Sequence, residues 1–234
     1  MTDDLLAAVR ARFDGRAAEY DRSAMHRELA AAVADFADLD AVGDVLDVAT
    51  GTGLVLRALR DRDPVLRLTG IDLSGGMLEV ARAELPDATL TEGDATVLPF
   101  GDDTFDLVTC ATGLHLFPDA DAAVAEWARV LRPGGRVVTA TFGDVDLSQH
   151  GGRPGAAVAG HAGAGRHGAE PPPYPTHHER FRTPELVAEA VAPAGLVVAR
   201  HAWWTHGDDR VLLAELRRAP ATPEVRRETP PGSP

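Results

Sequence analysis

The chain has 234 residues, with 36 acidic and 23 basic side chains and a formal net charge of −13. Hydrophobic residues make up 44% of the sequence, as in an ordinary globular domain. The single cysteine excludes an intrachain disulfide framework. No apolar run approaches the roughly 20 residues that span a membrane, and the start MTDDLLAAVRAR has no apolar segment of a secretory signal. We therefore expect a cytoplasmic protein.

The charge also limits the expected partners. All the basic residues are arginine, and they form no basic stripe along the chain. Nucleic-acid and anionic-membrane binding both depend on clustered positive charge. We therefore expect no nucleic-acid or membrane partner. The expected partner is a small molecule or another protein.

The amino end predicts two helices. Apolar residues recur at helical spacing in two groups: Leu5, Leu6, Val9 and Phe13, then Met25, Leu29, Val33 and Phe36. The segment FDGRAAEYDRS separates the groups, and Ser23 is a candidate N-cap for the second helix. We expect residues 1–40 to cover the main domain as capping helices.

Strands and helices then alternate. Short apolar strands are expected at 44–49, 67–72, 88–94, 105–111 and 136–142, with helices at 54–62, 74–85 and 119–131. Ser74 is a candidate N-cap, and RPGG at 132–135 predicts a turn. This alternation is typical of a parallel sheet covered by helices on both faces.

The remainder of the chain predicts a loop, a hairpin and a tail. Residues 143–182 are rich in glycine and alanine without a hydrophobic period, which favours a long loop or flap. Thr183 and Pro184 begin a helix, and strands at 196–204 and 210–216 form an antiparallel hairpin. The prediction is an α/β, doubly wound, seven-stranded and mainly parallel sheet, with its domain at 41–217 and a flexible tail at 218–234.

Candidate ligand-binding residues follow the first four strands. Ligands of doubly wound sheets bind outside the carboxyl ends of the strands. The turn Asp47-Val48-Ala49-Thr50-Gly51-Thr52-Gly53 lets a backbone approach a ligand. Asp72 is placed to accept hydrogen bonds from ribose hydroxyls. Asp94 is placed for an adenine amine, and the segment 110–115 for the reactive end of the ligand.

Two kinds of ligand suit a glycine turn with a ribose carboxylate. A dinucleotide normally uses G-x-G-x-x-G/A, but Leu56 stands where the third glycine or alanine belongs. The other ligand is adenosine joined to a sulfonium amino acid, whose ammonium Asp47 could bind directly or through a water. The spacing favours the second ligand.

Four segments carry a family resemblance: DVLDVATGTG, GIDLSGGMLEVAR, EGDATVLPFGDDTFDLVTCATGLHLF and EWARVLRPGGRVV. In order and spacing they resemble the motifs of class I S-adenosylmethionine-dependent methyltransferases. The chain is similar to the small-molecule branch that includes the ubiquinone and menaquinone C-methyltransferases. Its segment FDGRAAEYD also resembles the lead-in helix of that branch. The resemblance covers residues 13–142 and, more loosely, 181–217.

The resemblance implies a Rossmann-like fold, S-adenosyl-L-methionine as cofactor, and roles for matching residues. Ala49, Thr50 and Gly51 would line the methionine part, and Asp72 would hold the ribose. The remaining implied contacts are Leu73 and Met77 beside the adenine or sugar, Asp94 and Ala95 at the adenine, Ala111 near the sulfonium and Tyr20 closing over the cofactor.

Departures from the family pattern narrow the acceptor. Ala49 replaces the first glycine of the usual loop, and some quinone-type relatives share that alanine. No Asn/Asp-Pro-Pro-Tyr follows the fourth strand, which disfavours base or glutamine N-methylation. The carboxylate set of metal-dependent catechol-type enzymes is also missing, so no metal ligands are assigned.

Several side chains allow two interpretations. His115 is the candidate general base, because its unperturbed pKa suits neutral pH. The alternative, which a lone histidine favours, is that it caps a short helix or packs under the flap. Five histidines at 150, 161, 167, 177 and 178 have no regular ligand spacing and favour a solvated flap over a metal site. Trp203 and Trp204 should face opposite sides of a strand and pack.

The function predicted is methyl transfer to a small-molecule acceptor, on carbon or oxygen, by in-line displacement. The alternative keeps the cofactor but catalyses cyclisation, decarboxylation or rearrangement. A nicotinamide oxidoreductase is disfavoured by Leu56. The acceptor's identity and the oligomeric state stay open, with a homodimer among the alternatives.

Overall fold

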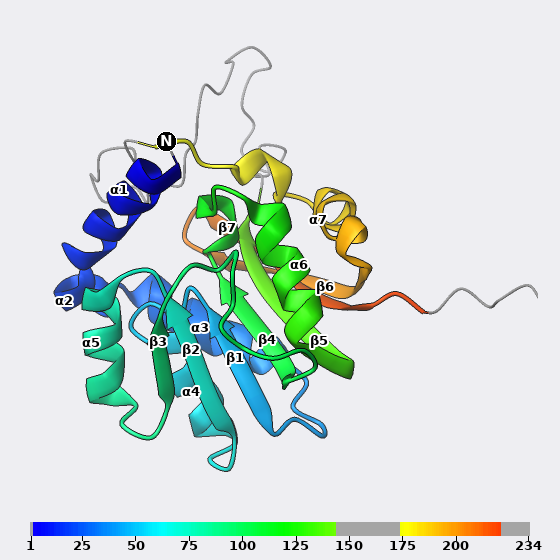
Figure 1. Cartoon of the computed structure of the whole chain (residues 1–234), viewed down its shortest axis with the longest axis horizontal. Coiled ribbons are helices and arrows are strands. Elements are labelled where there is room, and N and C mark those ends of the chain that lie inside the picture. The colour runs from blue at the N-terminus through cyan, green and yellow to red at the C-terminus, as the bar shows by residue number, and fades with distance from the viewer. Residues whose placement is uncertain (1, 144–173, 221–234) are drawn as a thin grey trace, which may run out of the picture.

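The computed structural model describes residues 2–143 and 174–220 (Figure 1). Its strands are β1 (Asp44–Val48), β2 (Arg67–Asp72), β3 (Thr89–Glu92), β4 (Phe105–Ala111), β5 (Leu131–Phe142), β6 (Leu196–His206) and β7 (Asp209–Arg218). The α-helices are α1 (Thr2–Asp14), α2 (Ala17–Tyr20), α3 (Ala24–Phe36), α4 (Leu54–Arg62), α5 (Gly75–Glu84), α6 (Ala120–Val130) and α7 (Pro184–Val191). Short 3₁₀ turns are η1 (Leu114–Leu116), η3 (His178–Arg180) and η4 (Ala192–Ala194).

The seven strands form one sheet in the order β3-β2-β1-β4-β5-β7-β6. The first five strands pair in parallel, whereas β7 pairs antiparallel with both β5 and β6. The predicted doubly wound sheet with a carboxyl-terminal hairpin is confirmed. Strand order reverses between β1 and β4, where a ligand crevice is expected.

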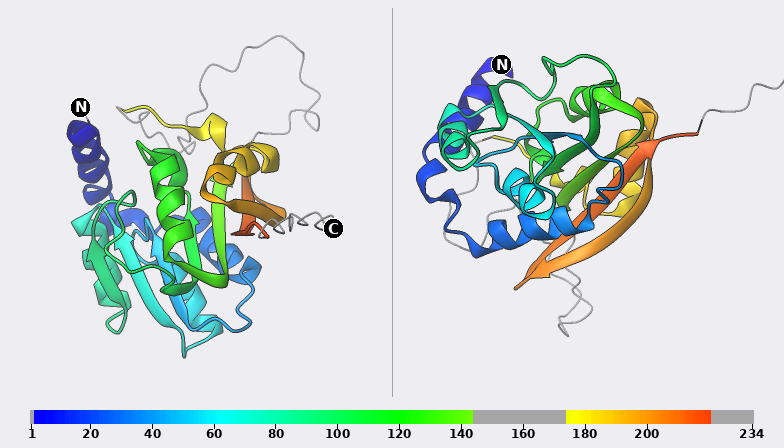
Figure 2. Two further views of the ribbon diagram at one scale, coloured as in Figure 1. Left: turned by 45° about the vertical axis from the view of Figure 1, so that its right-hand side comes forward. Right: turned by 90° about the horizontal axis from the view of Figure 1, so that it is seen from below.

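Helices cover both faces of the sheet (Figure 2). Residues of α6 and α7 pack with one face in a cluster centred on Trp127, and α3 and α4 pack with the other. Alternation along the strands produces these two clusters: Leu46 and Val108 lie in the first, whereas Val45 and Leu107 lie in the second.

Helix starts follow the predicted caps. Ser23 Oγ accepts a hydrogen bond from His26 N, Ser74 Oγ from Met77 N, and Thr183 Oγ1 from Leu186 N. Each bond satisfies a backbone donor that the first helical turn leaves unpaired. The predicted N-caps are confirmed, and they fix the positions at which the helices leave the loops around the site.

Two local predictions need correction. The break between the amino-terminal helices contains the short helix α2. RPGG at 132–135 is a bulge within β5 and not a separate turn. Phe105 of β4 pairs with Leu131, but Leu107, two residues later, pairs with Arg136, so the four residues of RPGG lie between the two pairings. A Cβ on Gly135 would lie 2.9 Å from the backbone oxygen of Asp106, so the bulge packs too tightly against β4 for any other residue.

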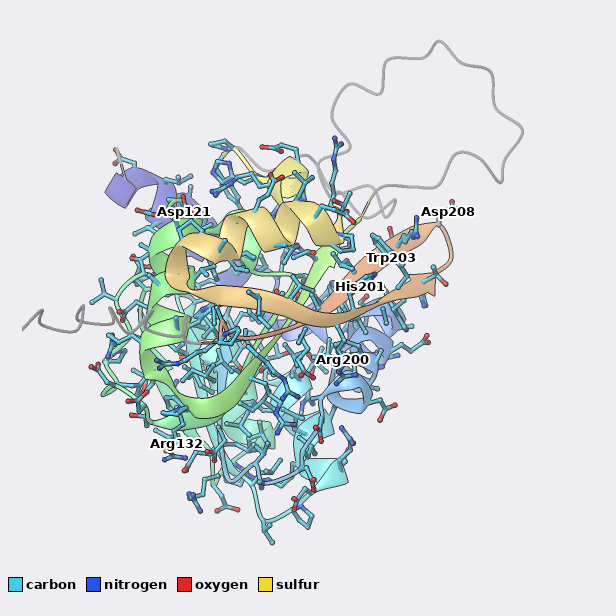
Figure 3. All side chains as sticks on the ribbon, turned by 90° about the vertical axis from the view of Figure 1, so that its right-hand side faces the viewer. Asp121, Arg132, Arg200, His201, Trp203 and Asp208 are labelled. Carbon is cyan, nitrogen blue, oxygen red and sulfur yellow. The ribbon has the colours of Figure 1, made fainter. Side chains whose placement is uncertain are left out.

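The hairpin closes one edge of the sheet, with Arg200, His201 and Trp203 along β6 (Figure 3). Trp203 packs with the cluster of α6 and α7, and Trp204 with the opposite cluster. The prediction that the two tryptophans face opposite sides and pack is confirmed. Arg200 lies over the Phe36 ring at 4.1 Å and bonds the buried Glu215, which ties the hairpin to α3.

Helix α1 stands beside the carboxyl ends of β2 and β3, next to α5 (Figure 1). Asp14 accepts hydrogen bonds from Ser74 Oγ at 2.5 Å and Gly76 N at 2.9 Å. These bonds lower the pKa of Asp14 and hold α1 over the edge where ligands are expected.

Most of the predicted flap, residues 144–173, and most of the predicted tail lie outside the described residues. No helix in the described ranges is long and apolar enough to cross a membrane.

Candidate active site

A cavity of about 760 Å³, open to solvent, lies at the carboxyl ends of the central strands. Its walls come from α1, α2 and the loops that follow β1, β2, β3 and β4. The lining includes Leu6, Val9, Phe13, Tyr20, Ala49, Gly51, Ile71, Asp72, Leu73, Met77, Gly93, Asp94, Ala95, Ala111, Thr112, Gly113, Leu116, Phe117 and Pro118. Nine of the residues predicted for cofactor binding therefore meet in one cavity.

Asp72 ends β2 at the centre of this cavity. One carboxylate oxygen accepts a hydrogen bond from Gly51 N at 2.7 Å and the other from Ser74 N at 2.8 Å. Burial raises the pKa of Asp72, and these backbone donors oppose the rise. The carboxylate is held rigidly, and each oxygen keeps a lone pair for a further donor.

The turn after β1 exposes its backbone to the cavity. Ala49 and Gly51 both have φ of 56°, a left-handed conformation that glycine adopts without strain. A Cβ on Gly51 would meet no atom within 4 Å. The open space above Gly51 lets a ligand approach the main chain.

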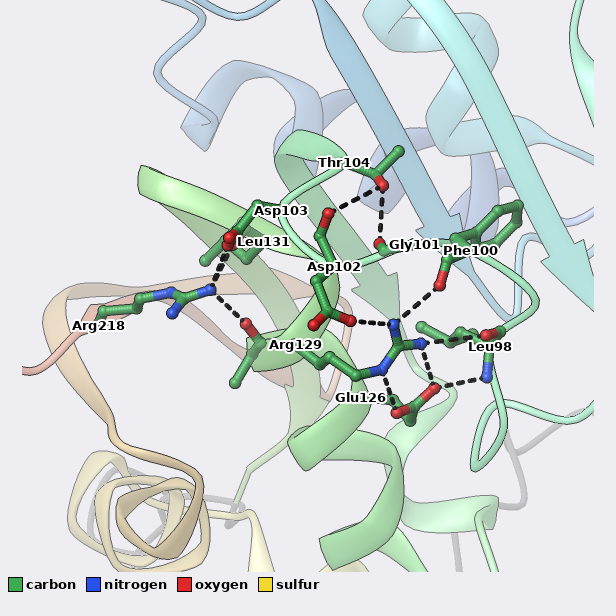
Figure 4. A network of polar contacts seen from close by, with 11 residues as sticks. Leu98, Phe100, Gly101, Asp102, Asp103, Thr104, Glu126, Arg129, Leu131 and Arg218 are labelled. Atoms are coloured by element: carbon green, nitrogen blue, oxygen red, sulfur yellow. Dashed lines mark hydrogen bonds and ion pairs between the residues drawn. The ribbon is translucent and has the colours of Figure 1, made fainter.

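Asp94 and Ala95 lie in the loop after β3, and both line the cavity. Asp94 accepts a hydrogen bond from Thr96 N at 2.9 Å, which fixes its side chain. Further along, Arg129 of α6 donates to the carbonyls of Leu98 and Phe100. Figure 4 shows this network, which also includes Glu126 and Asp102. The loop that carries Asp94 is thereby anchored to α6.

A second cavity of about 420 Å³ adjoins the first, and both are lined by Tyr20, Ala49, Gly51, Ala111 and Thr112. Asp47 and Thr50, the remaining two predicted cofactor contacts, line only this second cavity. Asp47 is 1% exposed and accepts a hydrogen bond from Thr109 Oγ1 at 2.6 Å. Burial raises the pKa of Asp47 to about 7, so a cationic ligand group would stabilise its charged form.

Tyr20, at the end of α2, forms part of both cavity walls. Its ring stacks on that of His26 with centroids 4.1 Å apart. Burial raises the pKa of its hydroxyl to about 12, so the phenol stays protonated. The periodicity of the sequence could not place this residue, and only the family resemblance pointed to it.

His115 lies in η1 but is not among the cavity-lining residues. It is 6% exposed and stacks on His178 with centroids 3.8 Å apart. His177 N donates to the His115 carbonyl at 2.9 Å. Burial and the neighbouring histidines hold the pKa of His115 well below its usual value. In this arrangement the neutral ring packs under the described end of the predicted flap, which carries His177 and His178, so its role as a base stays a prediction.

Cys110 is fully buried at the end of β4, and burial raises the pKa of its thiol. A protonated, inaccessible thiol is a poor nucleophile. Within the described residues, no group of three or more histidine, cysteine or acidic side chains could hold a metal ion. His150, His161 and His167 lie outside that part of the chain.

Sequence reasoning missed part of the site. Leu6, Val9 and Phe13 of α1 were recognised only as a helical apolar face, yet that face forms a wall of the first cavity. His26 lines the second cavity and was not considered. The signal available was the Ser23 cap, which places His26 in the first turn of α3.

Comparisons with known proteins agree with this geometry. Residues 46–139 match a family model described as a methyltransferase domain. Demethylmenaquinone methyltransferase of Thermotoga maritima is 47% identical over 94 residues, which cover 40% of this chain and 41% of that protein. The ubiquinone/menaquinone biosynthesis C-methyltransferase UbiE of Geobacter sulfurreducens is 39% identical over 107 residues, 43% of this chain and 42% of that protein. The chain thus matches less than half the length of these curated relatives.

Solved structures share the fold over more of the chain. The methyltransferase in complex with the Trm112 activator of Haloferax volcanii gives a TM-score of 0.64 at 24% identity, over 88% of this chain and 97% of that one. Magnesium protoporphyrin IX methyltransferase of Synechocystis, with bound S-adenosylhomocysteine, gives 0.59 at 17% identity, over 83% of this chain and 84% of that one.

The sheet order gives the chain a Rossmann-like fold, which it shares with the solved methyltransferase structures. More particularly, residues 46–139 match the methyltransferase-domain model, and less than half of the chain is similar to the demethylmenaquinone and ubiquinone/menaquinone methyltransferases named above.

Proposed function

We propose that the protein is an S-adenosyl-L-methionine-dependent methyltransferase that transfers a methyl group to a carbon or oxygen atom of a small molecule. One observation carries the proposal: acidic side chains from the ends of three successive strand–loop units line two adjoining cavities beside the glycine turn. Asp47, Asp72 and Asp94 line the two adjoining cavities. The named relatives are methyltransferases, which favours transfer over the non-methylating alternative.

The residues present fit this cofactor. Asp72 keeps lone pairs for ribose hydroxyls beyond its two backbone donors. Leu73 and Met77 give apolar flanks, and Asp94 with Ala95 would meet the adenine. Asp47 would pair with the ammonium, while Ala49, Thr50 and Gly51 would contact the methionine part and Ala111 the sulfonium. Tyr20 would cover the cofactor from α2.

The bound cofactor supplies a methyl group already activated by a positively charged sulfur. The protein's task is then to align the acceptor behind that methyl and exclude water. Proximity and orientation can lower such a barrier by about 7–11 kcal/mol. Leu116, Phe117 and Pro118 line the same cavity as Ala111, and α1 forms a further apolar wall of it. We place the acceptor against these walls.

An acceptor hydroxyl or enolisable carbon must also lose a proton. We keep His115 as the candidate base, because its neutral ring can accept a proton. Its ring is not among the cavity-lining groups and stacks on His178, so the segment carrying His177 and His178 would have to move to open a path. We propose that residues 143–182 act as a cover over the acceptor.

The remaining organisation is also proposed. Residues 1–40 would be capping helices, 41–217 the cofactor-binding domain and 218–234 a tail. We propose a small-molecule partner, without nucleic acid or membrane, and a cytoplasmic location. A homodimer is one of the oligomeric states to test by light scattering.

The test combines binding with product analysis. Titration calorimetry with S-adenosylmethionine and S-adenosylhomocysteine should show binding of both, and absence of heat or thermal shift with either would contradict the proposal. With an acceptor in hand, product mass should rise by one methylene equivalent while the cofactor loses its methyl group. A product of changed structure with the cofactor intact would instead establish the non-methylating alternative.

A further inference from the structure

The second cavity offers one side chain that can balance the negative charge of an amino-acid ligand. Its described lining contains three titratable groups: Tyr20, His26 and Asp47. Tyr20 stays neutral and Asp47 is acidic. His26 is therefore the lining residue, in the part of the chain that the structure describes, whose side chain can become a cation.

Nearby arginines are engaged elsewhere. Arg57 pairs with Asp21 and, at 3.4 Å, with Glu84. Arg16 lies over the rings of Phe13 and Tyr20 at 5.9 and 5.7 Å. Neither arginine lines the second cavity. Of the cations around α2, α3 and α4, only the imidazole of His26 reaches its wall.

Local structure fixes the orientation of the ring. Ser23 caps α3 through His26 N, and the imidazole stacks on Tyr20 at an interplanar angle of 16°. Nδ1 lies 3.4 Å from the Tyr20 carbonyl, which can only accept, so Nδ1 carries a proton. Nε2 is the ring atom left to bind a ligand, and it donates only when the imidazole is doubly protonated.

In the proposed cofactor, the ammonium and the carboxylate sit on the same carbon atom. If the ammonium pairs with Asp47, the carboxylate must lie close by and away from that like charge. We propose that protonated His26 binds the carboxylate of the cofactor's amino-acid part, and so selects a zwitterionic ligand over one that carries only the ammonium. This inference rests on the proposed function, because it assigns a residue to one end of the same cofactor.

The environment of His26 agrees with a ring that gains its proton on binding. Burial lowers the pKa of His26 in the ligand-free protein, and Arg16 adds to this. The Tyr20 carbonyl, Asp21 and Asp209 oppose the shift. A carboxylate against Nε2 would raise the pKa again.

Three ligands separate the parts of the cofactor: S-adenosylmethionine, its decarboxylated form and 5′-methylthioadenosine. The first two differ only in the carboxylate, and the third lacks the whole amino-acid end. Calorimetry at pH 6.5 should show that the wild-type protein prefers the first over the second by roughly tenfold or more, as expected for a charge-assisted hydrogen bond. In His26→Asn that preference should fall to near one, with methylthioadenosine affinity unchanged. His201→Asn, on the exposed part of β6, is the matched control and should behave as wild type.

Equal loss of affinity for all three ligands in His26→Asn would show that the ring only supports Tyr20, and the inference would be wrong. A preference retained in the variant would also overturn it. The wild type gives an independent reading should the variant not fold: its preference should shrink as the pH rises from 5.5 to 7, and a constant preference contradicts protonated His26. Asp47 affects both charged ligands alike and cancels in this ratio. If the wild type binds none of the three, the proposed function itself fails.

Discussion

The carboxylate of Asp72 accepts a hydrogen bond from the backbone N–H of Gly51 at 2.7 Å. This bond joins the end of β2 to the turn after β1, so the residue proposed to hold the ribose also shapes the turn proposed to hold the methionine part. A substitution at this position therefore acts on two parts of the cavity.

Replacing Asp72 with asparagine should weaken cofactor binding strongly. The amide cannot accept charge-assisted hydrogen bonds from both a ribose and the backbone, and each such bond contributes about 1.5–3 kcal/mol. We expect affinity for S-adenosylhomocysteine to fall by at least one order of magnitude, roughly 10–100-fold, as measured by calorimetry. Asp87→Asn, at an exposed position after α5, is the control. Equal binding by both variants would contradict the role of Asp72.

Asp47 should make the stability of the ligand-free protein depend on pH. Its folded pKa, about 7, lies above the unfolded value of 3.8. The folded state therefore binds more protons in this window, and stability falls as the pH rises from about 4 to 7. Asp47→Asn removes this pH-dependent contribution. The free energy of unfolding of the variant should therefore rise relative to that of the wild type by up to a few kcal/mol towards pH 8.

Urea unfolding at pH 5, 6, 7 and 8 checks this prediction. The difference between the variant and the wild type isolates Asp47, because the histidines titrate in both proteins. With cofactor bound, this stability difference should change in the opposite direction with pH, since the ammonium of the cofactor favours the charged carboxylate of Asp47. A difference that stays constant across the four pH values would show that Asp47 is ionised throughout.

The sequence predicted the features set by local rules. Hydrophobic alternation and the caps Ser23, Ser74 and Thr183 gave the strands, the helices and their starts, since each depends on neighbours within a few residues. Asp72 and Asp94 were predictable as site residues because the carboxyl ends of parallel strands meet at one edge.

Tertiary packing determined the features that the sequence did not predict. The first-turn position of His26 follows from its cap, but its place in the second cavity depends on how α3 packs beside β1. His115 follows a strand that ends at the site, yet η1 directs its ring away from the cavity and against His178. Spacing along the chain cannot tell these two histidines apart.

His115→Ala should separate packing from catalysis. Its folded pKa lies well below the unfolded value of 6.5, so the neutral stack on His178 stabilises the fold above pH 6.5 and is lost as the pH falls. We expect the variant to unfold more easily by about 2–3 kcal/mol at pH 7, as for other truncations of a buried side chain, and to lose less stability than wild type between pH 7 and 5.

Cofactor affinity should be spared in His115→Ala, and turnover should fall if the ring serves as the base. His178→Ala is the comparison, because it removes the stack but keeps the imidazole of His115. Lower turnover in His115→Ala alone supports the catalytic role. Equal turnover losses in both variants would assign His115 to packing.

Ala49 should be a position where glycine stabilises the protein. Its φ of 56° is left-handed, which costs a residue with a Cβ about 1–2 kcal/mol. Glycine relieves that strain but gains entropy in the unfolded chain, worth about 0.4–1 kcal/mol, so Ala49→Gly should gain roughly 0.5–1 kcal/mol.

Ala41→Gly is the matched control, because Ala41 has φ of 57° in the turn before β1 and lines neither cavity. Both variants should gain similar stability in urea unfolding. Cofactor affinity should stay within about twofold of wild type in both, since backbone groups and not the Ala49 methyl are proposed to contact the ligand. A loss of affinity confined to Ala49→Gly would mean that the methyl group itself holds the turn in its binding shape, and that the alanine in place of the usual glycine is a functional feature of this site.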